Sequence, residues 1–147
     1  MVKKPNMERK QRFDCMKQKH ILVVDDEQNT LRSMEFILEA ANYQVSVAKN
    51  GYEALKVLSN ELKTCSPIDL IITDIQMPML TGLKLIEKLQ EFSYGIPVLI
   101  ITGYGNKQLY AQLLENGYNE ILDKPIEEDE LLRRVKKLIN NGNQPGR

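Results

Sequence analysis

Polar side chains that could bind a metal or an anion follow several short apolar runs in this sequence. The run at residues 70–73 leads into Asp74, and the run at 20–24 is followed by Asp25 and Asp26. Thr102 closes a third run, and Lys124 follows a fourth. A carboxylate at the end of a buried strand is costly unless another group compensates its charge. A cation is therefore expected beside Asp74.

Three clustered carboxylates need a cation, because two unit charges 4 Å apart repel by roughly 4 kcal/mol at an effective dielectric near 20. Lys124 is one candidate. Mg²⁺ is the other, since it takes carboxylate oxygens and keeps waters for a phosphate-bearing ligand. Asp74 could then be a nucleophile that forms an aspartyl phosphate. Lys124 and Thr102 could contact the phosphoryl oxygens. The residue types thus predict phosphoryl chemistry on a carboxylate.

Strands that alternate with helices would position these groups. Apolar runs and amphipathic periods predict strands at 20–24, 43–48, 69–73, 97–102 and 119–122, and helices at 30–42, 51–62, 82–90, 107–117 and 127–139. Five such units predict an α/β fold, a doubly wound parallel sheet with helices on both faces. Working groups in such sheets lie beyond the carboxyl ends of the strands. If strands one, three, four and five are neighbours, the candidate residues share one edge.

From about residue 20 to residue 140 the chain resembles the response-regulator receiver domain of two-component signalling, of the chemotaxis type. The resemblance rests on VVDDE, LIITDIQMPMLTG, VLIITGYG and DKPI, which occur in order across some 120 residues. It implies a flavodoxin-like (βα)5 fold with strand order 2-1-3-4-5. It also implies a cis peptide bond between Lys124 and Pro125.

The resemblance also implies a role for each site residue. Asp74 would be the phosphoacceptor, and Thr102 and Lys124 would bind the phosphoryl group. The implied cofactor is Mg²⁺, held by Asp25, Asp26, Asp74 and the backbone carbonyl of Gln76. Such a protein is not an enzyme but a phosphoryl acceptor, with at most slow self-dephosphorylation.

One position departs from the family pattern, because Ile121 stands where the family usually carries Phe or Tyr, three residues before the lysine. The usual aromatic readout of phosphorylation is therefore in doubt. The implied partners are a histidine kinase or phosphotransfer protein and a downstream protein. The downstream protein would contact the face made by the fourth helix, the fifth strand and the fifth helix. The implied state is a monomer or a phosphorylation-dependent dimer.

Length predicts one domain, which the resemblance makes a receiver domain at 20–140, with a basic extension at 1–19 and a tail at 141–147. The extension carries seven Lys or Arg and two acidic residues, so residues 20–147 carry a net −5 in a chain of zero net charge. This acidity argues against binding of nucleic acid by the domain. Two cysteines without metal-ligand spacing fit a reducing compartment. No segment has the length of a membrane span, so a cytoplasmic location is expected.

Other protein classes share parts of this sequence pattern. A phosphatase of the haloacid-dehalogenase class needs a second Asp two residues after its nucleophile, where this chain has Gln76. A flavodoxin-like cofactor carrier needs a phosphate loop after the first strand, where Asp25, Asp26 and Glu27 would repel an anion. An interaction module that is not phosphorylated, or a receiver excised from a larger hybrid kinase or regulator, stays open.

Overall fold

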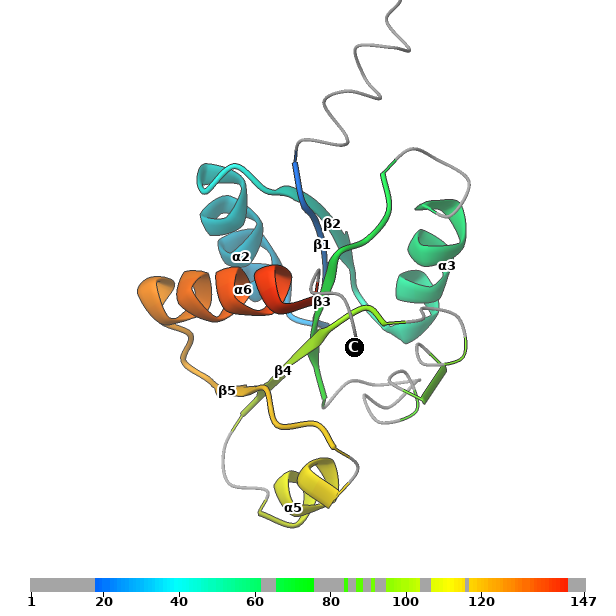
Figure 1. The fold of residues 1–147 in the computed structure, drawn as a ribbon, viewed down its shortest axis with the longest axis vertical. Helices are drawn as coiled ribbons and strands as arrows, with labels where there is room; N and C mark the ends of the chain where they lie inside the picture. Colours follow the sequence, from blue (N-terminus) through cyan, green and yellow to red (C-terminus); the bar gives the residue numbers. More distant parts are fainter. Residues whose placement is uncertain are drawn as a thin grey trace, which may run out of the picture.

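The computed structural model of this protein is a five-stranded parallel sheet with helices on both faces (Figure 1). It describes residues 18–61, 66–75, 95–103, 107–115 and 117–142, and the single positions 84, 87, 88 and 91. The strands are β1 (His20–Val24), β2 (Gln44–Ala48), β3 (Leu70–Asp74), β4 (Val98–Thr102) and β5 (Ile121–Asp123). The described helices are α2 (Gln28–Ala40), α3 (Gly51–Glu61), α5 (Lys107–Glu115) and α6 (Glu128–Gly142).

The strand order is β2-β1-β3-β4-β5, and each neighbouring pair is parallel. The expected order 2-1-3-4-5 is therefore confirmed. All five residues of β1 and of β3 are buried, as central strands covered on both faces require. Successive side chains point to opposite faces of a strand. Accordingly Ile21 and Val23 enter one core cluster and Leu22 and Val24 another.

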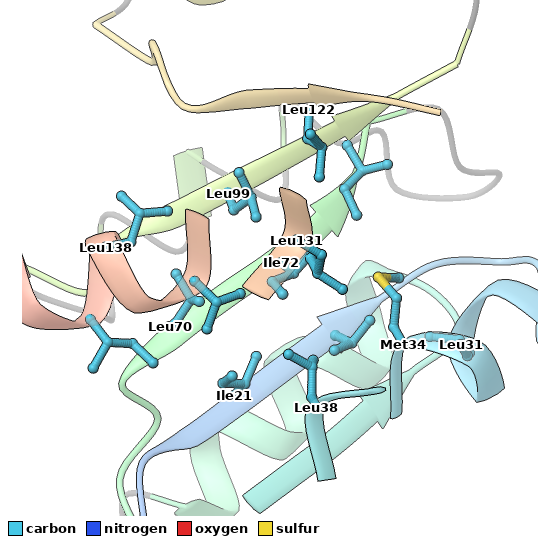
Figure 2. Close-up of a cluster of buried hydrophobic side chains, with 14 residues drawn as sticks. Ile21, Leu31, Met34, Leu38, Leu70, Ile72, Leu99, Leu122, Leu131 and Leu138 are labelled. Carbon is cyan, nitrogen blue, oxygen red and sulfur yellow. The ribbon is translucent and has the colours of Figure 1, made fainter. Parts of the chain in front are cut away.

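The larger core cluster lies between the sheet and helices α2 and α6 (Figure 2). From α2 it takes Leu31, Met34 and Leu38, which are buried, and the half-buried Ile37 packs against it. These four residues form one apolar face of the helix, which agrees with the amphipathic period that predicts a helix here. Leu131 anchors α6 with no exposed surface. Burying such a side chain contributes roughly 1.5–3 kcal/mol, so packing holds these two helices on the sheet.

Two helices end on a residue in the left-handed conformation. Asn42 has φ 72° after α2, and Gly117 has φ 88° after α5. After α2, the Asn42 N–H donates to Glu39 O at 2.9 Å and the Tyr43 N–H to Leu38 O at 3.1 Å. This is the Schellman pattern. The helix stop that the sequence predicts at Gly117 is confirmed.

Several boundaries differ from the prediction. Helix α2 begins at Gln28 rather than residue 30, and β5 covers Ile121–Asp123 rather than 119–122. In the segment predicted as a helix at 127–139, acids stand near the start and bases near the end, a pattern that predicts a match to the helix dipole at both ends. Helix α6 has acids in its first turn, but it continues to Gly142 and has no basic residue in its last turn. The predicted match is therefore wrong at the last turn, and the helix crosses the expected tail boundary. The helix predicted at 82–90 lies mostly outside the described residues. No helix in the described part of the chain is long and apolar enough to cross a membrane.

Candidate functional site

Three carboxylates gather at the carboxyl edge of the sheet. Asp25 follows β1 and Asp74 ends β3, and these strands pair with Val24 opposite Thr73. One oxygen each from Asp25, Asp26 and Asp74 lies within 4.8 Å of the others. The predicted proximity of the three carboxylates is therefore confirmed. Asp25 and Asp74 are buried and Asp26 is exposed, so the cluster opens to solvent on one side.

Lys124 contacts two of these carboxylates. Its Nζ lies 3.1 Å from Asp25 Oδ2 and 3.0 Å from Asp74 Oδ2. Its backbone N–H donates to Thr102 O at 2.9 Å, which holds the start of the loop after β5 beside β4. Burial lowers the pKa of the Lys124 ammonium, but the bonds to Asp74 and Asp25 together outweigh burial and raise it. The expected cis peptide bond between Lys124 and Pro125 is present.

Asp25 has no exposed surface. Its Oδ1 accepts a hydrogen bond from the Glu27 N–H at 2.8 Å. Its Oδ2 pairs with the Lys124 ammonium at 3.1 Å but meets no hydrogen-bond geometry with any described donor. Burial raises the pKa of the Asp25 carboxyl, and the Glu27 amide and Lys124 offset only part of that effect. A buried oxygen without a hydrogen bond, beside two further carboxylates, fits a hard cation that takes oxygen ligands.

Thr102 closes β4 at the same edge of the sheet and lies opposite Asp123. Its side chain is buried, and its hydroxyl donates to Gly103 O at 3.1 Å. In this structure the Thr102 hydroxyl is therefore hydrogen-bonded to the residue that directly follows it. Gln76, predicted to offer its backbone carbonyl to the metal, lies outside the described residues, as does Tyr104. The role given to Gln76 stays a prediction.

A hollow of about 250 Å³ beside Lys124 is a feature that the sequence did not indicate. The side chains around it come from α2 and from the loop after β5. They are Asn29, Thr30, Ser33, Met34, Ile37, Lys124, Pro125 and Ile126. Residues 29 and 33 are four apart and so share a helix face, but nothing in the sequence says which loop faces them.

His20, the only histidine of the chain, lies at the opposite edge of the sheet and is 1% exposed. Its Nδ1 is 3.0 Å from Ser66 O and its Nε2 is 2.7 Å from Ser46 Oγ. Its backbone N–H donates to Asp69 Oδ2 at 2.8 Å. His20 therefore has a packing role in this structure, because these bonds join β1 to β2 and to the segment before β3.

The fold and the carboxylate cluster together define a doubly wound α/β domain with an acidic site at the carboxyl ends of β1 and β3. A family model described as "Response regulator receiver domain" matches residues 21–136. The chain belongs to this family of receiver domains from two-component response regulators.

Relatives and solved structures agree with this assignment. The chain is 35% identical over 127 residues to an uncharacterized 14.6 kDa protein of Leptolyngbya boryana, covering 85% of this chain and 93% of that protein. It is similar to a CheY-like receiver domain protein from Methanospirillum hungatei, with 29% identity, a TM-score of 0.78 and coverage of 88% and 99%. A receiver domain protein from Clostridium thermocellum has 29% identity, a TM-score of 0.75 and coverage of 84% and 95%.

Many other relatives are longer regulators. The chain is 28% identical over 120 residues to the transcriptional regulatory protein FixJ of Bradyrhizobium diazoefficiens, covering 82% of this chain but 56% of that protein. For the regulatory protein GlrR of Escherichia coli the covered share is 25%. The chain thus spans a quarter to about half of these transcriptional regulators.

Proposed function

We propose that Asp74 accepts a phosphoryl group from a histidine kinase or a phosphotransfer protein in a Mg²⁺-dependent reaction. The observation that carries this proposal is the group of three carboxylates within 4.8 Å, two of which also contact Lys124. The three carboxylates carry more negative charge than the Lys124 ammonium offsets. That excess favours a divalent cation, and the cation in turn favours a phosphoryl oxygen.

Asp25, Asp26 and Asp74 would hold the Mg²⁺, together with the backbone carbonyl of Gln76. When bound, the ion supplies positive charge that both the accepting carboxylate and the phosphoryl group share. The burial of Asp25 and the position of its Oδ2, which pairs with Lys124 but accepts no hydrogen bond from a described donor, support its place in this set. Asp26 is exposed, which leaves the cluster accessible from solvent.

In the transfer step, a carboxylate oxygen of Asp74 forms a bond to phosphorus as the bond from phosphorus to the donor histidine nitrogen breaks. The imidazole leaves with the electron pair and takes up a proton. The Lys124 ammonium, already 3.0 Å from Asp74 Oδ2, neutralises charge on the phosphoryl oxygens. The Thr102 hydroxyl gives up Gly103 O and donates to another phosphoryl oxygen.

The protein would signal through contact with a downstream protein rather than through catalysis. The candidate face for this contact is made by α5, β5 and α6. The phosphoryl group on Asp74 would be lost only slowly by self-hydrolysis. We place the receiver from residue 20 to the end of α6 at Gly142 rather than at residue 140, with 1–19 and 143–147 outside it, as a monomer or a phosphorylation-dependent dimer. The two cysteines without metal-ligand spacing support a cytoplasmic location.

Labelling with acetyl phosphate tests this function. The chain should take up one phosphoryl group per molecule only with Mg²⁺ present, and the product should be stable in acid and labile in base. Asp74→Asn should take up none while keeping its fold. Asp123→Asn is the matched control, because this exposed carboxylate lies next to Lys124 but outside the cluster. A folded wild-type chain that takes up no phosphoryl group would instead indicate an interaction module that is not phosphorylated.

A further inference from the structure

Helix α2 exposes an aromatic side chain on the face that points away from the sheet. Leu31, Met34 and Leu38 are buried on the sheet side of the helix (Figure 2). Phe36 is two residues from both Met34 and Leu38, which is about 200° of rotation around a helix. It is 77% exposed, more than any other large apolar side chain in the described part of the chain. Covering this ring would remove apolar surface from water, which favours a contact there.

Acidic side chains border the ring. A shallow hollow of about 350 Å³ lies on the same face of α2. The described residues that line it are Arg32, Glu35, Phe36, Glu39 and Ala40. The last turn of α2 has no basic residue, so the negative end of the helix dipole adds to the charge of Glu39. This outer face of α2 therefore combines an aromatic ring with net negative charge, and it favours a basic occupant.

The chain enters the domain beside this outer face. Gln18 is the first described residue, and its Nε2 donates to Oδ1 of Asn42, just after α2, at 3.2 Å. The Gln44 N–H donates to Lys19 O at 2.9 Å, which fixes the entry point at the start of β2. Phe36 lies six residues before Asn42, about 9 Å along a helix axis. The preceding segment is thus tethered close to the ring.

Residues 1–17 have the composition that the outer face of α2 favours. They contain six Lys or Arg against two acids, a net charge of +4. Three of these bases stand in the run RKQR at residues 9–12. A chain spans at most about 3.6 Å per residue, so the six residues from Arg12 to Gln18 bridge up to roughly 20 Å. The run is therefore within reach of Phe36.

We propose that the basic run at 9–12 binds the outer face of α2 in the same molecule. Its cations pair with Glu35 and Glu39, and a cation also lies over the ring of Phe36. Each such contact is weak at an exposed surface, but the tether at Gln18 raises the effective concentration of the run to the millimolar range. The contact does not require a phosphoryl group on Asp74. A protein that binds this face of α2 must then displace the run.

A second copy of the chain is a less favourable occupant of this face. A two-fold contact places the same patch of both chains face to face. Glu35 and Glu39 of one chain would then oppose the same carboxylates of the other, and like charges across an interface are unfavourable. The basic run offers the opposite charge without this cost.

Acrylamide quenching of a single tryptophan tests the proposal in the full chain. The sequence has no Trp, so Phe36→Trp places one fluorophore on the outer face of α2. Adding Arg9→Gln, Lys10→Gln and Arg12→Gln at low ionic strength should raise the quenching constant about twofold, because a millimolar effective concentration covers the face about half of the time even through a millimolar contact. Salt at about 1 M, where the Debye length is about 3 Å, should remove this difference.

A charge exchange separates docking from a general effect on α2. Glu35→Lys with Glu39→Lys should raise the quenching constant as much as the loss of the three bases does. Exchanging those three bases for Glu in the same chain should restore the protection, which a merely loosened helix would not show. Glu115→Lys is the matched control, because it reverses an exposed acid on α5, and it should leave the quenching constant unchanged.

Equal quenching with and without the three bases at low ionic strength would overturn the docking and leave the face to another protein. A charge-exchanged chain that stays unprotected would overturn it too. Protection that rises with protein concentration, together with a dimer in light scattering, would assign the face to a second copy and refute binding within one molecule. The chain with Phe36 in place gives an independent check, because removal of the three bases should shift the amide NMR signals of Glu35 and Glu39; unchanged signals would contradict the proposal.

Discussion

Replacing Lys124 by Met removes the ammonium that contacts two carboxylates of the cluster. Nζ lies 3.0 and 3.1 Å from two carboxylate oxygens, and each such pair is worth roughly 5 kcal/mol at an effective dielectric near 20. Desolvation and side-chain ordering offset much of this, and breaking a buried pair costs about 3–5 kcal/mol. Because the Lys124 side chain is 23% exposed, we expect Lys124→Met to lower the free energy of unfolding by about 2–3 kcal/mol.

Urea denaturation with EDTA and with saturating Mg²⁺ measures this effect. Without Lys124 the cluster carries more uncompensated negative charge, so Mg²⁺ should bind more tightly and stabilise the variant more than the wild type. The difference between the two proteins should therefore shrink when Mg²⁺ is added. Lys137→Met is the control: Lys137 pairs with Glu120 Oε1 at 3.4 Å but is 57% exposed, so its loss should stay within about 0.5 kcal/mol. Equal stability of Lys124→Met and the wild type in EDTA, or a difference that Mg²⁺ does not reduce, would refute this reasoning.

Substitutions at three further positions probe separate features. Asp25→Asn removes a buried charge, so it should raise the free energy of unfolding of the metal-free protein by about 1 kcal/mol. It should also weaken Mg²⁺ binding, which calorimetry would measure, and an unchanged Mg²⁺ affinity would exclude Asp25 as a ligand. Hydrogen bonds from Arg133 and then Arg134 lower the pKa of Glu130 from 4.5, so the stability it contributes is present above pH 4.5 and lost as pH falls through its folded pKa. Glu130→Gln should therefore lower the melting temperature at pH 7, with the difference closing in acid; a difference independent of pH would contradict this. Asn42→Ala should cost about 1 kcal/mol because its φ is 72°, and Asn42→Gly should recover most of that loss in the same urea titration.

The sequence predicted most of the fold because its apolar runs are unusually continuous. Leu70 and the three residues after it are buried on both sides of β3, and a run of that kind has few alternatives to a central parallel strand. Element ends were predicted less well. Helix α6 continues through Asn140 and Asn141 to Gly142, although Asn and Gly have low helix propensity. Propensity therefore does not predict where this helix ends.

The sequence predicted the members of the site and their meeting at one edge of the sheet, but not the individual contacts between them. Strand order brings Asp25 and Asp74 to neighbouring strand ends, so their meeting follows from topology. That Lys124 contacts both carboxylates depends on the path of the loop after β5, which no periodicity encodes. The packing of Tyr118 against the cluster of Ile75, Ile100, Leu113 and Ile121 could not be predicted either, because it depends on the left-handed turn at Gly117 and on the placement of α5 against the sheet.

The site of phosphoryl attachment is the most direct test of the central claim. After incubation with acetyl phosphate and Mg²⁺, borohydride reduction converts an aspartyl phosphate into homoserine, which peptide mass spectrometry locates. We predict homoserine at position 74, in the wild type and in Asp123→Asn alike, and none when EDTA replaces Mg²⁺. Homoserine at another carboxylate, or its absence from a folded protein loaded under these conditions, would contradict the account.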